Sequence, residues 1–245
     1  MLKVKQNETN LAAPLVTMTL FGYRGIECFW AFAQMAFAPR QLKCVDGLRF
    51  WKLLGSGRGS GFSLRPNWSR YGLLAVWDSS AAADLFFEKS QLMNDYRRHA
   101  AEMWTVRLLP LQARGKWSQS NPFLPLAMPP ESAGPVAVLT RATIRWSRLI
   151  KFWSAAPSTS RALESAPGLI ASIGVGEAPF FRQATFSLWR SEADIQAFAY
   201  GNSAHREVIR RTRDEGWYRE DLFARFVPIA SKGTWNGRDP LERML

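Results

Sequence analysis

Two histidines and two cysteines are the residues best suited to ligate a metal or transfer a proton. They are His99, His205, Cys28 and Cys44. Imidazole and thiolate are common transition-metal ligands, and imidazole also exchanges protons near neutral pH. The cysteines form no CxxC or CxxH pair, so we expect reduced thiols rather than a disulfide framework or a zinc cluster. No HExxH motif and no assignable Ser–His–Asp set accompany the histidines, which makes a hydrolase a poor interpretation.

Helical spacing gives both histidines an inward position. His205 follows a glycine-asparagine-serine break that is typical of a helix start, and it shares an apolar stripe with Val208 and Thr212. The positive end of the helix dipole would favour neutral imidazole there, which is the ligating form. His99 lies in line with Tyr96 in a second helical pattern. The ordinary alternative for each histidine is a packed or hydrogen-bonded core residue.

The composition is that of a globular protein with a basic surface. The chain has 245 residues, 47% of them apolar, and a formal charge of +12. The basic residues are scattered and accompany no nucleic-acid-binding motif, so we expect no nucleic acid; an anionic membrane surface would also attract them. No apolar run reaches the roughly 20 residues of a membrane-spanning helix, and no secretory signal opens the chain. We expect a cytoplasmic protein, soluble or peripheral at the inner membrane.

An internal repeat organises the chain. The first half holds Gly47-Leu48, Gly55-Ser-Gly57, Leu73–Asp78 and Gly115-Lys-Trp117, and the second holds Gly168-Leu169, Gly174-Val-Gly176, Thr185–Arg190 and Gly233-Thr-Trp235 in the same order. Each half reads strand–helix–strand–strand–helix–strand, which is the ferredoxin-like motif. Two such α+β units can cover each other's sheets, so the sequence predicts two fused βαββαβ repeats forming a pseudo-dimeric α+β barrel.

The expected elements follow from apolar periodicity. The predicted strands are 16–23, 48–54, 71–77, 105–111, 136–144, 169–175, 183–189 and 222–228. The predicted helices are 26–37, 81–103, 148–153 with 160–165, and 192–214. Ser79-Ser80 and Ser191-Glu192 are expected helix caps, and Pro39 and Pro157 are expected to mark helix ends. The predicted division is a first repeat over 15–120, a proline-rich linker over 121–135 and a second repeat over 136–240.

The glycine run over 55–61 resembles a phosphate cradle only superficially. No GK[ST] follows it, and a strand rather than a helix comes next. A flexible loop between strands explains it better, with a lid over the barrel mouth as one use. The surrounding segment also carries Phe62 and Trp68 among arginines, which suits docking at a membrane surface. An ordinary exposed loop with two packing anchors fits equally well.

The chain resembles the spheroidene monooxygenase family over residues 15 to 241. The segments that carry the resemblance are WAFAQMAFA (30–38), GLRFWKLLGSG (47–57), LTRATI (139–144), GEAPFF-RQATFSLW (176–189), HREVIRRTRDEGWYREDLFARF (205–226) and GTWNGRDPL (233–241). The resemblance implies a haem-containing oxygenase that uses O2 and external electrons to introduce a keto oxygen at C-2 of spheroidene-type carotenoids. The polar leader and the segment over 58–70 depart from the family pattern. No Rossmann fingerprint is present, so a separate donor such as a ferredoxin would supply electrons.

The resemblance also implies an iron site. A haem axial ligand is usually His, Cys, Met or Tyr, and His205 is our first candidate, with His99 second by analogy with related barrels that use their second half. Thiolate ligation by either cysteine is a weak alternative, because the glycine-containing loop that would precede such a ligand is missing. Arg141 and Arg182 are candidate partners of the haem propionates. For both, a salt bridge at the barrel end is an equally good interpretation.

The sequence is also compatible with two other classes of function. One is a non-catalytic protein that binds or carries haem or an apolar pigment, because no unambiguous catalytic acid or base is present. The other is a cofactor-free monooxygenase of the same fold. In each case some of the many aromatic residues would line a long apolar cavity.

Overall fold

The computed structural model describes residues 14–59, 61–123, 134–201 and 203–245, without the side chains of residues 200–206, 209 and 213. The first half contains β1 (Leu15–Gly22), α1 (Glu27–Leu42), β2 (Leu48–Gly57), β3 (Pro66–Trp77), α2 (Ser80–Lys89), α3 (Gln91–His99) and β4 (Glu102–Gly115). The second half contains β5 (Val136–Ile144), the 3-10 turn η1 (Trp146–Arg148), α4 (Leu149–Glu164), β6 (Leu169–Ala178), β7 (Arg182–Trp189), α5 (Glu192–Gly201), α6 (Ser203–Asp214) and β8 (Tyr218–Gly233).

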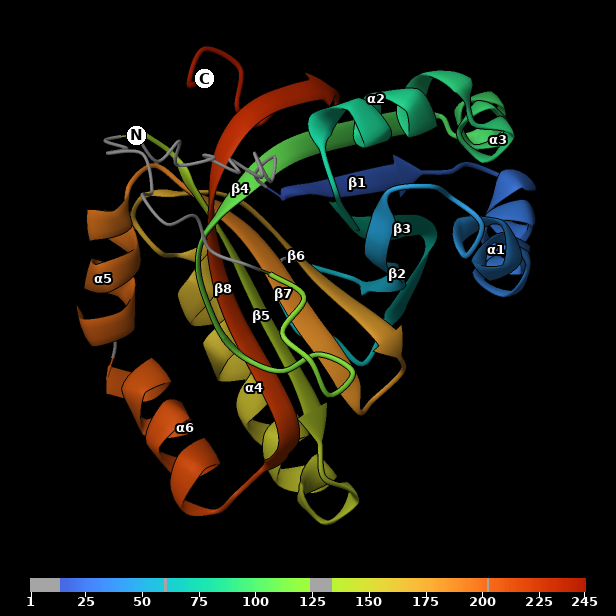
Figure 1. The fold of residues 1–245 in the computed structure, drawn as a ribbon. Helices are drawn as coiled ribbons and strands as arrows, with labels where there is room; N and C mark the ends of the chain where they lie inside the picture. Colours follow the sequence, from blue (N-terminus) through green and yellow to red (C-terminus); the bar gives the residue numbers. More distant parts are fainter. Residues whose placement is uncertain (1–13, 60, 124–133, 202) are drawn as a thin grey trace, which may run out of the picture.

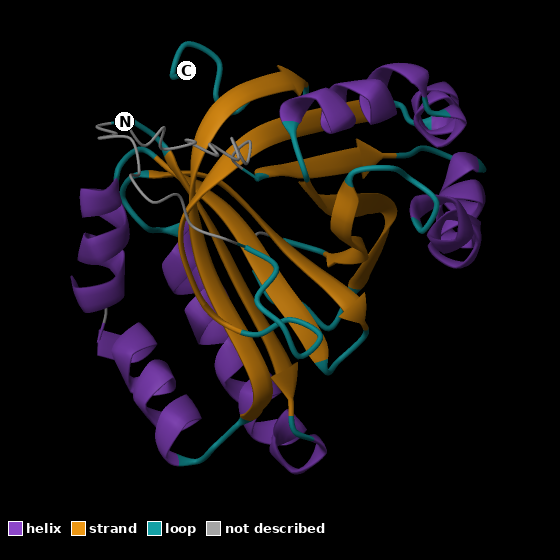
Figure 2. Cartoon of the chain, in the orientation of Figure 1, coloured by secondary structure: helices purple, strands orange, loops and turns teal. Residues whose placement is uncertain are grey.

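The eight strands form one closed antiparallel barrel in the order β1-β3-β2-β6-β7-β5-β8-β4. The first-half helices lie outside the barrel at one side and the second-half helices at another (Figure 1, Figure 2). The two junctions between the halves differ in length. β4 and β8 pair along most of their length, whereas β2 and β6 pair only through Gly55 with Gly176 and Ser56 with Val175. The barrel is therefore closed by one long seam and one short one.

Alternation along the strands separates an inner core from the layers under the helices. On β5, Ala137 and Leu139 belong to the core inside the barrel, while Val138 packs beneath helices of the second half. The first-half helices cover a separate apolar cluster that includes Trp77 and Tyr96. The predicted mixed α+β barrel is confirmed, and all eight predicted strands are present, several of them longer than expected.

The helices differ from the sequence-based prediction at their prolines. Pro39 and Pro157 were expected to mark helix ends, but both lie inside helices, α1 and α4. The predicted helix over 81–103 is two helices that end at His99, because Ser90 adopts an extended conformation between them. The expected cap at Ser79 is confirmed, since its side chain accepts a hydrogen bond from the backbone N–H of Ala82. None of the helices that the structure describes is long and apolar enough to cross a bilayer.

Candidate functional site

One cavity lies between the outer face of the second-half sheet and helices α4, α5 and α6. We call it the α4 pocket; its volume is about 350 Å³. Strands β5 and β7 form its floor with Val138, Thr140 and Thr185, and α4 contributes a wall that includes Phe152 and Ala156. Because apolar and small side chains dominate, the pocket suits a flat or extended apolar ligand better than a charged one.

The glycine-rich loop of the first half completes this pocket. Gly61 and Phe62 line it, the Phe62 ring meets Phe152 edge-on at 5.2 Å, and Ser160 Oγ donates to the Phe62 carbonyl at 3.3 Å. A Cβ at Gly174 of β6 would lie 1.9 Å from the carbonyl oxygen of Gly61, so only glycine permits this approach. The described part of the loop thus lies against the second half and shapes a cavity under α4. Trp68 belongs to β3 rather than to this loop.

His205 belongs to α6 by sequence, but its side chain lies outside the described residues. Val208 and Thr212 of the same helix line the α4 pocket. These are the residues whose helical spacing from His205 led to the expected inward stripe. The assignment of His205 as a metal ligand stays a prediction.

His99 lies in the first half, at the last residue of α3, and lines neither cavity. Its Nδ1 pairs with Glu27 Oε2 at 2.6 Å, and its ring stacks on Trp30 with centroids 4.0 Å apart. These contacts match the ordinary alternative of a packed, hydrogen-bonded histidine. Of the two thiols, Cys44 is exposed and Cys28 is partly buried, and both are free.

Arg141 is buried inside one end of the barrel, where it is only 4% exposed. Its guanidinium pairs with Glu220 and, at 3.1 Å, with Glu177, and it lies over the Trp117 ring. Its neighbours Thr140 and Ala142 line the α4 pocket, so strand alternation directs Arg141 to the opposite face of the sheet. The structure therefore shows the salt-bridge alternative for Arg141. Two carboxylates already pair with this guanidinium, and its role toward a propionate stays a prediction.

Arg182, the second predicted propionate partner, is exposed at the start of β7 and lines neither cavity. It is not brought together with Arg141 at a common site. Among the residues that the structure describes, no three His, Cys, Asp or Glu side chains converge as a metal-binding group. A haem iron held by one protein ligand would need no such cluster.

The ion-pair network around Arg141 is a feature that the sequence does not predict. Lys52 Nζ lies 3.0 Å from Glu177, and the Trp117 indole donates to the same carboxylate at 2.7 Å. Burial raises the pKa of Glu177, but the hydrogen bond and charge of Lys52 and the charge of Arg141 outweigh it and hold that pKa below its ordinary value. Each member comes from a different strand or turn, so no spacing in the sequence signals the cluster.

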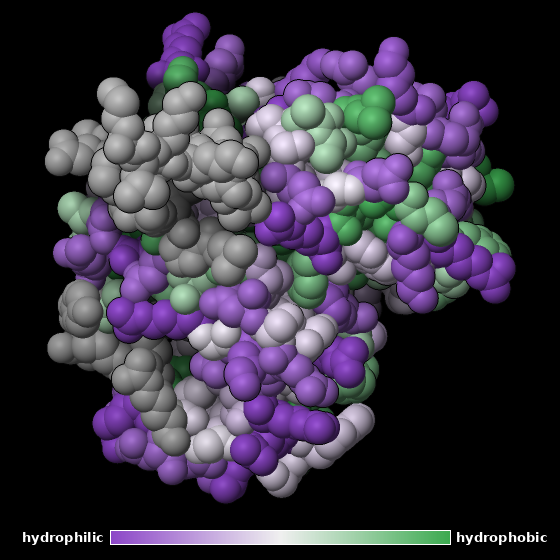
Figure 3. All heavy atoms as spheres, in the orientation of Figure 1, coloured by the Kyte–Doolittle hydropathy of each residue, from purple (hydrophilic) through white to green (hydrophobic). Residues whose placement is uncertain are grey.

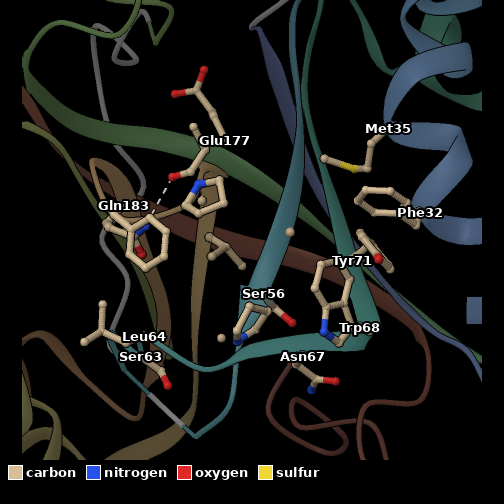
Figure 4. A pocket seen from close by; sticks show the side chains of 18 residues that line it. Phe32, Met35, Ser56, Ser63, Leu64, Asn67, Trp68, Tyr71, Glu177 and Gln183 are labelled. Carbon is tan, nitrogen blue, oxygen red and sulfur yellow. Dashed lines mark hydrogen bonds between the residues drawn. The ribbon is translucent and has the colours of Figure 1, made fainter.

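A second cavity, the α1 pocket, lies beside the short seam between β2 and β6 and has a volume of about 280 Å³. Figure 4 shows Phe32 and Met35 projecting from α1 toward the side where Tyr71 and Trp68 lie. Glu177 and Gln183 lie across the cavity, where Gln183 Nε2 donates to the Ala178 carbonyl at 3.3 Å. Leu64 closes another side, so one loop supplies residues to both cavities.

The chain is similar along most of its length to three curated proteins. It is 39% identical to spheroidene monooxygenase of Rhodobacter capsulatus over 93% of this chain and 95% of that protein. The spheroidene monooxygenase of Rubrivivax gelatinosus is 41% identical over 85% of this chain and 80% of the relative. The spheroidene monooxygenase of Cereibacter sphaeroides is 35% identical over 94% of this chain and 71% of the relative. No protein-family model matches the chain.

Among solved structures, a crystal structure of aldoxime dehydratase aligns with a TM-score of 0.57 and 11% identity, covering 90% of this chain and 83% of that one. This likeness concerns the fold alone. The sequence relatives, by contrast, are similar enough to assign a class of enzyme, an oxidoreductase of the monooxygenase type. Because it is 35–41% identical to three relatives and covers more than two thirds of the length of each, the chain belongs to the spheroidene monooxygenase family.

Proposed function

We propose that this enzyme uses O2 to oxygenate a spheroidene-type carotenoid, with a keto group at C-2 as the final product. The observation that carries the proposal is the similarity to three spheroidene monooxygenases over most of the chain. Inserting one atom of O2 into a C–H bond converts the other atom to water with two external electrons and two protons. A second insertion at the same carbon followed by loss of water gives the ketone. An external donor such as a ferredoxin would supply the electrons.

The two cavities support an apolar, elongated substrate. The α1 pocket and the α4 pocket are separated by one short stretch of loop, in which Gly61 and Phe62 face one cavity and Ser63 and Leu64 the other. Their walls are largely aromatic and aliphatic, as a polyene requires. We place the chain of the carotenoid in the α1 pocket, with the carbon to be oxidised directed toward the α4 pocket.

We further propose that haem is held in the α4 pocket with His205 as its axial ligand. The residues present fit the macrocycle in part: the walls are apolar, and α6 borders the cavity through Val208 and Thr212. A bound haem would supply iron that activates O2. Around it, Phe62 and Phe152 would exclude water and pack against the ring. The predicted propionate partners fit less well, because neither Arg141 nor Arg182 lines the pocket.

The absorption spectrum of the purified, haem-supplied enzyme tests this site. We expect a Soret band that His205→Ala removes, because the iron loses its ligand. His99→Ala is the matched control, since it removes the chain's other histidine, which pairs with Glu27, and it should leave the band in place. Loss of the band only in the His99 variant would assign the ligand to His99. A colourless enzyme that still oxygenates spheroidene would indicate the cofactor-free alternative, and unchanged pigment with O2 and reductant would indicate a carrier.

We also propose that the barrel consists of two fused copies of one ferredoxin-like unit, divided as the sequence predicts. The first half contributes the strand order β4-β1-β3-β2 and the second β8-β5-β7-β6, which correspond position by position. The glycine-x-tryptophan motif supports the same equivalence. In both halves it forms a tight turn after the last strand, with Gly115 and Gly233 at φ of 91° and 92° and with Trp117 and Trp235 in isolated bridges.

A further inference from the structure

Helix α1 exposes a strip of large apolar side chains instead of the usual polar outer face. Ile26 and Phe29 lie about one turn apart, and Phe29 is 77% exposed. Phe32, one turn further, meets Trp68 edge-on with ring centroids 5.4 Å apart. We call this surface the α1 face and define it by six exposed residues: Ile26, Phe29, Phe32, Leu64, Trp68 and Phe180. Figure 3 shows hydrophobic residues on the side of the molecule where α1 lies.

Four of the six residues of the α1 face lie around one cavity, and helical spacing joins Ile26 and Phe29 to them through Phe32. Phe32, Leu64, Trp68 and Phe180 all line the α1 pocket. Contiguous exposed apolar patches of this kind mark interaction sites, because a soluble surface rarely tolerates them without a partner. Whatever covers the α1 face therefore also meets the opening of the pocket.

Exposed arginines accompany the apolar residues of the face. Arg24 precedes Ile26 by two positions, Arg65 follows Leu64, and Arg182 follows Phe180 by two. None of the three forms an ion pair with a carboxylate in the part of the chain that the structure describes. Aromatic side chains among uncompensated basic residues are the composition of surfaces that insert into anionic bilayers. A second copy on the same face would bring like charges together instead.

We propose that the α1 face docks the enzyme on the surface of an anionic lipid bilayer, with the α1 pocket opening toward the acyl chains. Ile26, Phe29 and Trp68 enter the interface, and the arginines contact lipid phosphates. A lipid-soluble substrate then passes from the bilayer into the cavity without crossing water. Only this last step rests on the proposed function; the docking itself depends on the surface alone.

Vesicle flotation tests the docking without pigment, haem or O2, so its failure is distinct from failure of the proposed activity. The probes are vesicles of phosphatidylcholine with phosphatidylglycerol and vesicles of phosphatidylcholine alone. The wild-type chain should float with the anionic vesicles and less with the neutral ones, and added salt should weaken the binding. Phe29→Glu should lower the vesicle partition coefficient at least about tenfold, because a charge takes the place of the ring that inserts into the bilayer.

Ile150→Glu is the matched control. Ile150 is 88% exposed in the first turn of α4, outside the α1 face. Phe29 also lies in the first turn of its helix, where a carboxylate favours folding, so both variants should remain folded. We expect Ile150→Glu to bind vesicles as the wild type does. Equal vesicle binding of both variants would overturn the proposal. So would a wild-type protein that does not float with the anionic vesicles. In that case a dimer that Phe29→Glu dissociates would identify a second copy of the chain as the partner of the α1 face.

Discussion

The buried guanidinium of Arg141 determines which substitutions one end of the barrel can accept without loss of stability. Arg141 is almost fully enclosed, and its two carboxylate partners come from β6 and β8. Removing one member of such a group leaves the others charged and desolvated, and this costs more than the group contributes as a whole. A substitution of Arg141 is therefore expected to cost less stability when a carboxylate partner is neutralised in the same variant.

Arg141→Met should destabilise the enzyme by about 3–5 kcal/mol, because Glu177 and Glu220 lose their buried counter-charge. Urea unfolding followed by circular dichroism measures the change. Adding Glu177→Gln should restore part of the loss. Arg49→Met is the control: both side chains of the Arg49–Asp78 pair are about half exposed, so the loss of this pair should change stability by no more than about 1 kcal/mol. Equal effects of the two arginine variants would contradict a special role for burial.

The same network predicts how stability depends on pH. The pKa of Glu177 is lower in the folded protein than its ordinary value of about 4.3. The folded state therefore binds a proton less readily than the unfolded state, and the stabilisation is present above about pH 4.3 and declines as pH falls through the folded pKa. Urea midpoints measured from neutral to acid pH should show this decline, and Glu177→Gln should make it shallower. An unchanged pH profile in the variant would argue against the contribution.

At the level of elements, serine side chains divide the helices of the first half. Ser79 caps α2, and Ser90 both ends α2 and caps α3 by accepting from the backbone N–H of Met93 at 3.5 Å. Apolar periodicity alone predicted one helix here, because the pattern continues across Ser90. The prolines gave the opposite error, because each predicted a helix end where the helix continues. Packing on the sheet keeps α1 and α4 intact across Pro39 and Pro157 despite the missing backbone hydrogen bond.

Ser79→Ala should lower the stability of the enzyme by about 1 kcal/mol, because an N–H in the first turn of α2 loses its acceptor. Thermal unfolding measures the difference. Ser80→Ala is the matched control, since the neighbouring serine is already within the helix and no capping bond is assigned to it. If both variants melt alike, the cap at Ser79 makes no net contribution.

At the scale of the whole molecule, much of the fold could be predicted from its sequence. Alternation in short β-branched and aromatic runs is a local signal, and it predicted all eight strands. The cavities could not be predicted, because they depend on which loop meets which helix. Phe62 and Phe152 are far apart in sequence but touch in the structure. Lys52, Glu177 and Glu220 likewise meet only through strand pairing across the barrel.

Phe62 in the α4 pocket has a consequence for biosynthesis. A ribosome releases this residue early, yet the cavity it completes also needs Phe223, which lies about 160 residues later in β8. Strand β8 pairs with both β4 and β5, so the compartment is assembled only after β8 has left the exit tunnel. Nascent chains consequently have no finished compartment until β8 has emerged, and whatever ligand this compartment accepts is loaded only after that point.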